Sequence, residues 1–264
     1  MPHLFIFGLG YSAKRIRAAT EALGWRVTAT GDDGEWAFED ETAVRAALGA
    51  ASHVLSSVPP AETADPVLAR YGDALGHGWL GYLSSTGVYG DTGGAWVDET
   101  APAGAGRRTA RDEADRAWLE RGARVFRLPG IYGPGRSVFE RLAEGRAHRI
   151  DLPGQVFSRI HVDDIAGGVI AALEAPPGAY NLADDLPASQ NAVIEEACRL
   201  LGVAPPPLQS LDAAGLSPQA RAFYAENRRV ANGKARRLLG WAPRYPTFRE
   251  GLAAILRPIS PAAR

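Results

Sequence analysis

The chain has 264 residues, of which 46% are hydrophobic and 22% charged, and its formal net charge is −1. This length suits one large α/β unit or a Rossmann domain with a small appendage. The charge balance gives no electrostatic case for binding nucleic acid or an anionic membrane, and the single cysteine, Cys198, excludes a disulfide framework and a cysteine-based metal site.

The first apolar run has no basic region before it, and Gly8 and Gly10 interrupt it early, so it is not expected to be a signal peptide. No stretch approaches the roughly twenty apolar residues of a membrane span. We therefore expect a cytoplasmic protein, and we predict no metal site.

The first elements are a buried strand, a glycine turn and a helix start. The apolar run Leu4–Phe7 precedes a Gly-x-Gly-x-x-Ala motif, and a helical pattern follows it. Gly8 permits a tight turn, Gly10 permits close approach of the backbone to a phosphate, and Ala13 permits close packing of helix on strand.

Backbone N–H groups at this helix start, including those of Tyr11 and Ser12, are placed to hold a pyrophosphate. The motif predicts dinucleotide binding. A plain glycine turn between strand and helix is the alternative, because such turns are common.

A second strand is predicted at Trp25–Thr30, and it leads into Gly31-Asp32-Asp33-Gly34. At this place in a Rossmann domain an acidic residue bonds the ribose 2′-OH, whereas an arginine accommodates a 2′-phosphate. No Lys or Arg lies between Thr28 and Val44. Asp32 is therefore a candidate cofactor residue and NAD is favoured over NADP, unless the two acids simply face water in a turn.

The next predicted elements are a helix at Thr42–Leu48 and strands at Ser52–Val58 and Trp79–Leu83. The first of these strands would bring its last residues and the following proline to the carboxyl edge of the sheet, where a dinucleotide runs. Those candidates are Ser57, Val58 and Pro59. Three hydroxyl residues, Ser84, Ser85 and Thr86, end the other strand, and Gly93–Gly106 is expected to be a surface loop.

Six ordered motifs carry a family resemblance. They are Gly8-x-Gly10-x-x-Ala13, Ser84–Gly90, Arg127–Gly135, Arg159–Ile165, Tyr180–Ala183 and Leu239–Pro243. Together they resemble an extended short-chain dehydrogenase/reductase of the NAD-dependent epimerase/dehydratase type. The Ser-Thr-Gly-Val-Tyr-Gly-Asp run is similar to an atypical bacterial branch of that family.

The resemblance implies an α/β fold, with a Rossmann-type doubly wound parallel sheet and a small C-terminal α+β substrate lobe. Residues 1–264 are expected to form one compact unit. Within it, 1–130 would be mainly the cofactor-binding part, with 161–183 returning to it. Residues 131–160 and 184–264 would be mainly the substrate lobe.

The resemblance also implies a catalytic hydroxyl residue, a tyrosine acid/base and a lysine. Ser85 matches the hydroxyl position, with Ser84 and Thr86 as alternatives. The family's Tyr-x-x-x-Lys pair falls on Arg107 and Arg111, and an arginine stays protonated where a phenol would cycle. The two arginines would suit an anionic group of the ligand, or else a solvated helix start.

Two other acid/base candidates are Tyr89 or Tyr132 from another loop, and His161. Packing is the favoured role of Tyr89. His161 would begin a helix capped by Asp163, and a structural role is favoured for it.

By resemblance, the backbone of Pro129, Gly130 and Ile131 would lie beside the nicotinamide. Arg136 would face the substrate lobe, and Arg228 or Arg229 would bind a diphosphate. Cys198 is expected to be a small buried hydrophobe on a helix at Ser189–Leu201. Other helices are predicted at Val138–Glu144, from Ser217-Pro218, before Gly240, and around Leu252 and Ile255.

The sequence thus predicts an NAD(P)-binding protein that resembles nucleotide-sugar epimerases, dehydratases and reductases, acting as an oxidoreductase or epimerase on a small or sugar-like substrate. A non-catalytic dinucleotide-binding sensor is the alternative, because the Tyr-x-x-x-Lys pair is replaced. The expected partner is a small molecule, such as a nucleotide-sugar or another anionic substrate. A homodimer through the helix that carries Trp118 is also possible by resemblance, although that residue would fit the core equally well.

Overall fold

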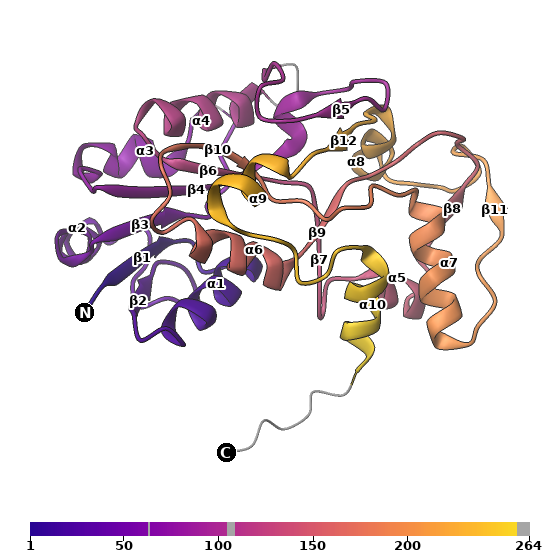
Figure 1. The fold of residues 1–264 in the computed structure, drawn as a ribbon, viewed down its shortest axis with the longest axis horizontal. Helices are drawn as coiled ribbons and strands as arrows, with labels where there is room; N and C mark the ends of the chain where they lie inside the picture. Colours follow the sequence, from indigo (N-terminus) through magenta and orange to yellow (C-terminus); the bar gives the residue numbers. More distant parts are fainter. Residues whose placement is uncertain (63, 105–108, 258–264) are drawn as a thin grey trace.

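The computed structural model describes residues 1–62, 64–104 and 109–257. In this part of the chain, six parallel strands form one sheet in the order β2-β1-β3-β4-β6-β10 (Figure 1). Their bounds are β1 (His3–Phe7), β2 (Arg26–Ala29), β3 (His53–Ser56), β4 (Trp79–Ser85), β6 (Arg124–Leu128) and β10 (Gly178–Asn181). The predicted parallel sheet is confirmed.

The order of the strands reverses between β1 and β3, because the chain builds β2 on one side of β1 and β3 on the other. In open α/β sheets a ligand binds outside the carboxyl ends of the strands at such a switch point. The glycine turn follows β1, and Ser57–Pro59 follow β3, so both predicted cofactor segments lie at this point.

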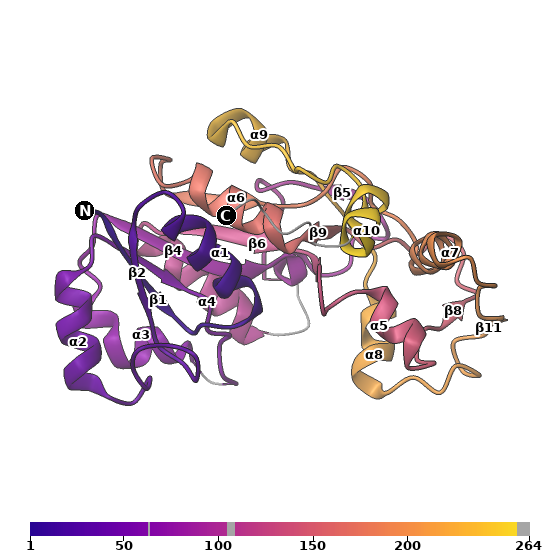
Figure 2. The ribbon, with the colours of Figure 1, turned by 90° about the horizontal axis from the view of Figure 1, so that it is seen from below.

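Helices cover both faces of the sheet (Figure 2). Along β1, Leu4 and Ile6 pack with one group of helices while Phe5 and Phe7 pack with the other, because successive side chains of a strand point to opposite faces. The first group is α1 (Tyr11–Glu21), α6 (Val162–Ala171) and α9 (Gly233–Leu239), and the second is α2 (Glu41–Ala50), α3 (Pro66–Tyr71) and α4 (Thr109–Glu120).

Trp118 on α4 belongs to the core. Its side chain is completely buried, its ring stacks on Tyr82 with centroids 5.3 Å apart, and its Nε1 donates to Asp65 Oδ2 at 3.0 Å. It is therefore not part of an exposed subunit-contact surface.

A second lobe lies beside the sheet (Figures 1 and 2). Its elements are α5 (Val138–Ala143), β8 (Arg149–Ile150), α7 (Gln190–Leu201), β11 (Leu208–Gln209), α8 (Pro218–Ala222) and α10 (Phe248–Leu256). A separate core that includes Ile194, Phe248 and Leu252 holds α5, α7 and α10 together. Cys198 lies in that core at 1% exposure, as predicted for a small hydrophobe.

Two short strand pairs join distant segments. β7 (Gly130–Tyr132) pairs with β9 (Arg159–His161), and β5 (Trp96–Val97) pairs with β12 (Arg229–Val230). The surface loop predicted at 93–106 is therefore wrong at 96–97, because a two-residue strand in a Gly-rich segment carries no alternating pattern. Residues 105 and 106 lie outside the described part.

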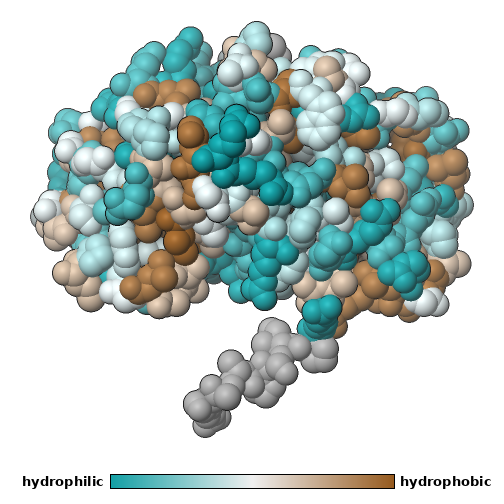
Figure 3. All heavy atoms as spheres, viewed as in Figure 1, coloured by the Kyte–Doolittle hydropathy of each residue, from teal (hydrophilic) through white to brown (hydrophobic). Residues whose placement is uncertain are grey.

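No helix of the described residues is both long and apolar enough to cross a membrane. Figure 3 shows hydrophilic and hydrophobic residues interspersed over the face of the molecule seen there.

A cleft at the switch point of the sheet

The glycine turn is fastened to both neighbouring strands. Gly8 has φ +79°, and a Cβ at this position would stand 3.0 Å from Val58 Cγ2. The Gly8 N–H donates to Thr30 Oγ1 at 3.0 Å, and Ser57 Oγ donates to the Gly8 carbonyl at 2.5 Å. Gly8, Ser57 and Val58 thus shape the turn, and only glycine fits its first position.

Gly10 differs from Gly8. Its φ is −81°, which any residue can adopt, and within the described part of the chain no atom lies within 4 Å of a Cβ placed there. It precedes the first residue of α1, and no described side chain caps that helix. The N–H groups of an 11-residue helix therefore open into free space, which suits a bound pyrophosphate.

A cleft of about 1620 Å³ begins at this helix start and extends between the sheet and the second lobe. It is larger than the roughly 300–1,000 Å³ of a common ligand pocket, so it has room for more than one molecule. The predicted residues that line it are Gly10, Tyr11, Ser12, Ser57, Pro59, Ser84, Ser85, Thr86, Arg111, Pro129, Gly130, Ile131, Tyr132, Arg136 and Arg228.

Other predicted residues lie outside its lining. Gly8 and Val58 support the turn, and Ala13 is buried beneath it in the core. Asp32 is exposed near the end of β2. The neighbouring Asp33 pairs with Lys14 Nζ of α1 at 2.5 Å, so a cation lies near this tip although the strand itself supplies none.

The hydroxyl residues after β4 have different surroundings. Ser85 is half-buried, and its Oγ accepts from the Gly87 N–H at 3.1 Å. Thr86 is only 3% exposed. Ser84 Oγ donates to Asp115 Oδ2 at 2.6 Å, which ties it to α4.

Asp115 is the centre of a buried polar network beneath the cleft. Arg127 Nη2 donates to Asp115 Oδ1 at 2.7 Å, and Arg127 Nη1 donates to Tyr89 Oη at 3.0 Å. Tyr89 in turn donates to Asn181 Oδ1 at 2.8 Å, and burial raises the pKa of its phenol. The Tyr89 hydroxyl thus holds elements together, which agrees with the packing role that was favoured for it.

His161 lies behind the cleft wall. It is 2% exposed, with its ring 5.2 Å from that of Tyr132 and 4.3 Å from that of Tyr245. Burial lowers its pKa to about 4, so the ring is neutral at neutral pH. Its Nδ1 accepts from the Asp163 N–H at 3.2 Å, so His161 itself caps α6, and the predicted cap by Asp163 is wrong.

The candidate arginines also have different surroundings. Arg111 of α4 lines the cleft, whereas Arg107 lies outside the described residues. The guanidinium of Arg136 lies 5.5 Å from the ring centre of Tyr11, whose hydroxyl donates to the Pro134 carbonyl at 3.1 Å. These contacts join the start of α1 to the turn after β7. Arg228 donates to the Gly90 carbonyl and to Glu226, each at 2.7 Å.

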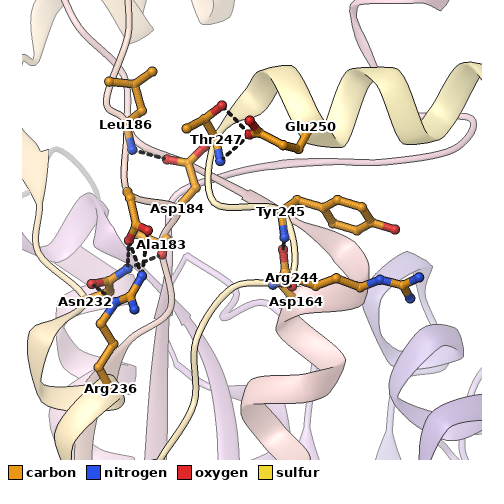
Figure 4. A network of polar contacts seen from close by, with 11 residues as sticks. Asp164, Ala183, Asp184, Leu186, Asn232, Arg236, Arg244, Tyr245, Thr247 and Glu250 are labelled. Carbon is orange, nitrogen blue, oxygen red and sulfur yellow. Dashed lines mark hydrogen bonds and ion pairs between the residues drawn. The ribbon is translucent and has the colours of Figure 1, made fainter.

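Two aspartates are buried outside the cleft lining (Figure 4). Asp164 accepts from the Arg244 N–H at 2.6 Å and the Tyr245 N–H at 3.2 Å. Asp184 is 1% exposed and accepts from the Leu186 N–H at 3.3 Å, and burial raises its pKa to about 8.

Sequence reasoning missed three residues in the second-lobe part of the cleft, namely Arg141, Arg159 and Tyr224. Arg159 lies in β9 and is only 7% exposed. β9 has the sequence Arg-Ile-His, so no apolar pattern marked this arginine as buried. The local sequence also does not indicate that Arg159 lies near Arg141 of α5 and Tyr224 of the segment after α8.

No protein-family model matches the chain. Among curated proteins, the chain is 34% identical over 140 residues to a 3-diazoavenalumate denitrifying reductase of a Streptomyces species, an alignment that covers 48% of this chain and 45% of the relative. It thus spans less than half of that reductase. Protein YeeZ of Escherichia coli is 28% identical, over 80% of this chain and 89% of the relative.

Solved structures agree over nearly the whole chain. A conserved protein of unknown function from Silicibacter pomeroyi has a TM-score of 0.86 at 41% identity, covering 97% of this chain and 98% of its own. Human epimerase family protein SDR39U1, solved with NADPH, has a TM-score of 0.78 at 17% identity, over 96% of this chain and 98% of that chain. The Thermotoga maritima UDP-glucose 4-epimerase, solved with UDP-glucose, has a TM-score of 0.74 at 18% identity, over 95% and 96%.

The fold is that of the extended short-chain dehydrogenases/reductases of the NAD-dependent epimerase/dehydratase type, as the ordered motifs predicted. The chain belongs to the same family as the Silicibacter pomeroyi protein.

Proposed function

We propose that this protein binds a nicotinamide dinucleotide in the cleft and acts as an oxidoreductase on a small molecule. The observation that carries the proposal is the start of α1. Gly10 leaves the space beside it open, no described side chain caps the helix, and Gly8 holds the turn in its φ +79° conformation. A pyrophosphate would complete this hydrogen-bonding site.

The comparisons support the proposal at the level of chemistry. A partial relative is named as a reductase, and structures of the same fold were solved with NADPH or with NAD. Their substrates differ, so they do not select one for this chain.

In this proposal a bound nicotinamide supplies or accepts a hydride. The N–H groups of α1 hold the diphosphate, and the backbone of Pro129–Ile131 lies beside the nicotinamide. Ser85 orients a substrate oxygen from the end of β4. Arg111 can orient an anion but stays protonated, so it cannot replace a tyrosine acid/base.

We further propose NAD rather than NADP as the preferred cofactor. Asp32 would accept from a ribose 2′-OH, whereas Asp32 and Asp33 would repel a 2′-phosphate. Lys14 offsets only part of this repulsion, because it already pairs with Asp33.

The second candidate function is a dinucleotide-binding protein without turnover. It is favoured by Arg111, which lines the cleft at the position that matches the family's lysine. The open second-lobe half of the cleft favours an enzyme, since a sensor of the dinucleotide alone would not need it.

Titration of the protein with NADH and NADPH, followed by nicotinamide fluorescence, tests the binding step. We expect saturable binding of NADH, with weaker binding of NADPH. Gly10→Asp provides the matched variant, because its carboxylate would cap α1 and repel a pyrophosphate. Binding to neither cofactor, or undiminished binding by Gly10→Asp, would contradict the proposal.

The catalytic step requires a screen of carbonyl and other reducible compounds with NADH. Turnover together with a loss of rate in Ser85→Ala would support the oxidoreductase. Cofactor binding without turnover across the screen would favour the second candidate.

A further inference from the structure

Two arginines and a tyrosine meet in the second-lobe half of the cleft. Burial lowers the pKa of Arg159 to about 10; the charge of Asp184 opposes this shift and that of Arg141 adds to it. Burial raises the pKa of the Tyr224 phenol, and the charges of Arg141 and Arg159 oppose that shift. All three residues line the cleft. Among the described residues, no carboxylate lies within ion-pair distance of either guanidinium.

Among the described residues, the hydrogen bonds of Arg159 occupy only part of its guanidinium. Its Nη1 donates to the carbonyls of Phe157 and Ala188, each at 2.8 Å, and its Nη2 donates to Gln190 Oε1 at 3.2 Å. Three of its five N–H groups are thereby used, and every acceptor is neutral. The N–H on Nε and one on Nη2 remain, and the described structure does not enclose Nε completely.

Nε and Nη2 form one edge of the guanidinium, which is the edge that binds the two oxygens of a carboxylate. Arg159 is 7% exposed and hydrogen-bonded only to neutral groups. The strongest opposing charge that acts on it is that of Asp184, whose own pKa burial raises to about 8, so at neutral pH this carboxyl is mostly protonated. A buried cation without a full counter-charge is costly to keep. The acids that line this half of the cleft already bond within the chain, Glu140 to Ser137, Glu144 to Arg146 and Glu226 to Arg228.

Apolar side chains form part of the wall in this half of the cleft. Val138, Val193, Phe248 and Leu252 line the same part of the cleft, and each is at most 6% exposed. The ring of Tyr224 meets that of Phe157 edge to face, with centroids 5.5 Å apart. Such a wall favours an apolar body over a hydrated sugar.

We infer that the substrate is a carboxylate on an apolar body, and that Arg159 binds that carboxylate through Nε and Nη2 with Arg141 and Tyr224 beside it. This inference names the substrate class for the proposed oxidoreductase and rests on it for the reaction. The binding site itself is independent of the dinucleotide, because its residues belong to the second lobe and β9.

The test is calorimetric titration of the full chain with 3-phenylpropionate, its neutral amide 3-phenylpropionamide, and UDP, up to about 20 mM, since a ligand of this size binds weakly. We expect the acid to bind at least about tenfold more tightly than the amide or UDP, because only the acid presents two carboxylate oxygens to Nε and Nη2 of Arg159. Equal affinity for acid and amide, tighter binding of UDP, or no binding of the acid would overturn the inference.

Substitutions of arginines test which residues bind the carboxylate. Arg159→Lys keeps the charge but loses the fork, so we expect at least about tenfold weaker binding of the acid. Arg141→Gln removes an exposed cation whose side chain makes no hydrogen bond or ion pair with the described residues, and we expect an about threefold loss of affinity. This variant tests the site even if Arg159→Lys does not fold. Arg199→Gln is the matched control, because Arg199 is an exposed arginine of α7 outside the cleft lining, and it should leave binding unchanged. An unchanged affinity in Arg141→Gln and in a folded Arg159→Lys would overturn the assignment.

Each titration is made without nucleotide and with saturating NADH. Carboxylate binding without any NADH binding would refute the proposed cofactor alone. NADH binding without carboxylate binding would refute this inference alone.

Discussion

Gly8 and Gly10 have different physical roles in the turn, although both are glycines of the same motif. Gly8 is required by the backbone, because its φ is +79° and a Cβ would press on Val58. The backbone conformation does not require glycine at position 10, so the role of Gly10 is to leave the space beside the helix start open. Only the structure separates these roles, because both residues fit the same Gly-x-Gly pattern.

This distinction predicts opposite effects on stability. Gly8→Ala should lower the free energy of unfolding of the unliganded protein by about 1–3 kcal/mol, since it places a Cβ in the left-handed region. Gly10→Asp should raise it by roughly a few tenths of a kcal/mol, because its carboxylate would cap α1 and interact favourably with the helix dipole. Urea denaturation without nucleotide measures both, and a destabilised Gly10→Asp would contradict the interpretation.

Asp184 predicts a pH dependence of stability. Its pKa of about 8 lies above the usual value near 4 of an unfolded aspartate, so the folded state holds an extra proton between these values. The contribution of this group therefore falls as the pH rises from about 4 to 8. The charged groups that act on it are Arg159, Asp185 and Asp164.

Asp184→Asn removes this titration while keeping an acceptor for the Leu186 N–H. We expect its stability to decline less than that of the parent protein between pH 5 and pH 8, as measured by urea midpoints at each pH. Parallel pH profiles for the two proteins would refute the role of Asp184.

At the scale of elements, the long ones were predictable because they carry local patterns. The apolar run of β1, the strands up to β6 and helix α7 follow from periodicity and turn residues. The β5–β12 pair was not predictable, since two residues give no alternation and the pairing joins positions 96–97 to 229–230. The ion pair between Lys14 of α1 and Asp33 likewise has no signal in the local sequence.

The cofactor half of the candidate site was largely foreseeable, because a glycine turn and strand ends have a fixed place in a doubly wound sheet. The half that contains Arg141, Arg159 and Tyr224 was not. Those three residues come from α5, β9 and the segment after α8, and only tertiary packing brings them together.

The network around Asp115 ties α4 to strands β4 and β6. Asp115→Ala would leave Arg127 buried without a counter-charge, so we expect a loss of about 3–5 kcal/mol in the free energy of unfolding. Asp212→Ala breaks the exposed pair with Arg221 and should cost less than about 1 kcal/mol. A loss below about 1 kcal/mol in Asp115→Ala would show that the network contributes little.

At the scale of the whole molecule, the chain passes repeatedly between the sheet and the second lobe. β9 and α6 lead from the second lobe back to the sheet, which β10 joins, and α7 enters the second lobe again. After α9 has packed on the sheet, α10 returns to the second lobe. We therefore expect one cooperative unfolding transition rather than two.

Two variants test that expectation. Phe248→Ala empties a fully buried position in the second lobe and should cost about 3–5 kcal/mol. Asp115→Ala acts in the sheet. Both should shift the same calorimetric transition to lower temperature. A second, separate transition in either variant would show that the lobes unfold independently.

The uncapped start of α1 has a further consequence for the protein in a cell. In the proposed function a phosphate supplies the acceptor that no described side chain provides at this helix end, so the ligand contributes to the hydrogen bonds of the folded state. The unfolded fraction then depends on the dinucleotide pool, because a ligand that binds only the native state lowers it by mass action. Depletion of that pool would expose more of the chain to proteases, and the lifetime of the protein would follow the metabolic state of the cell.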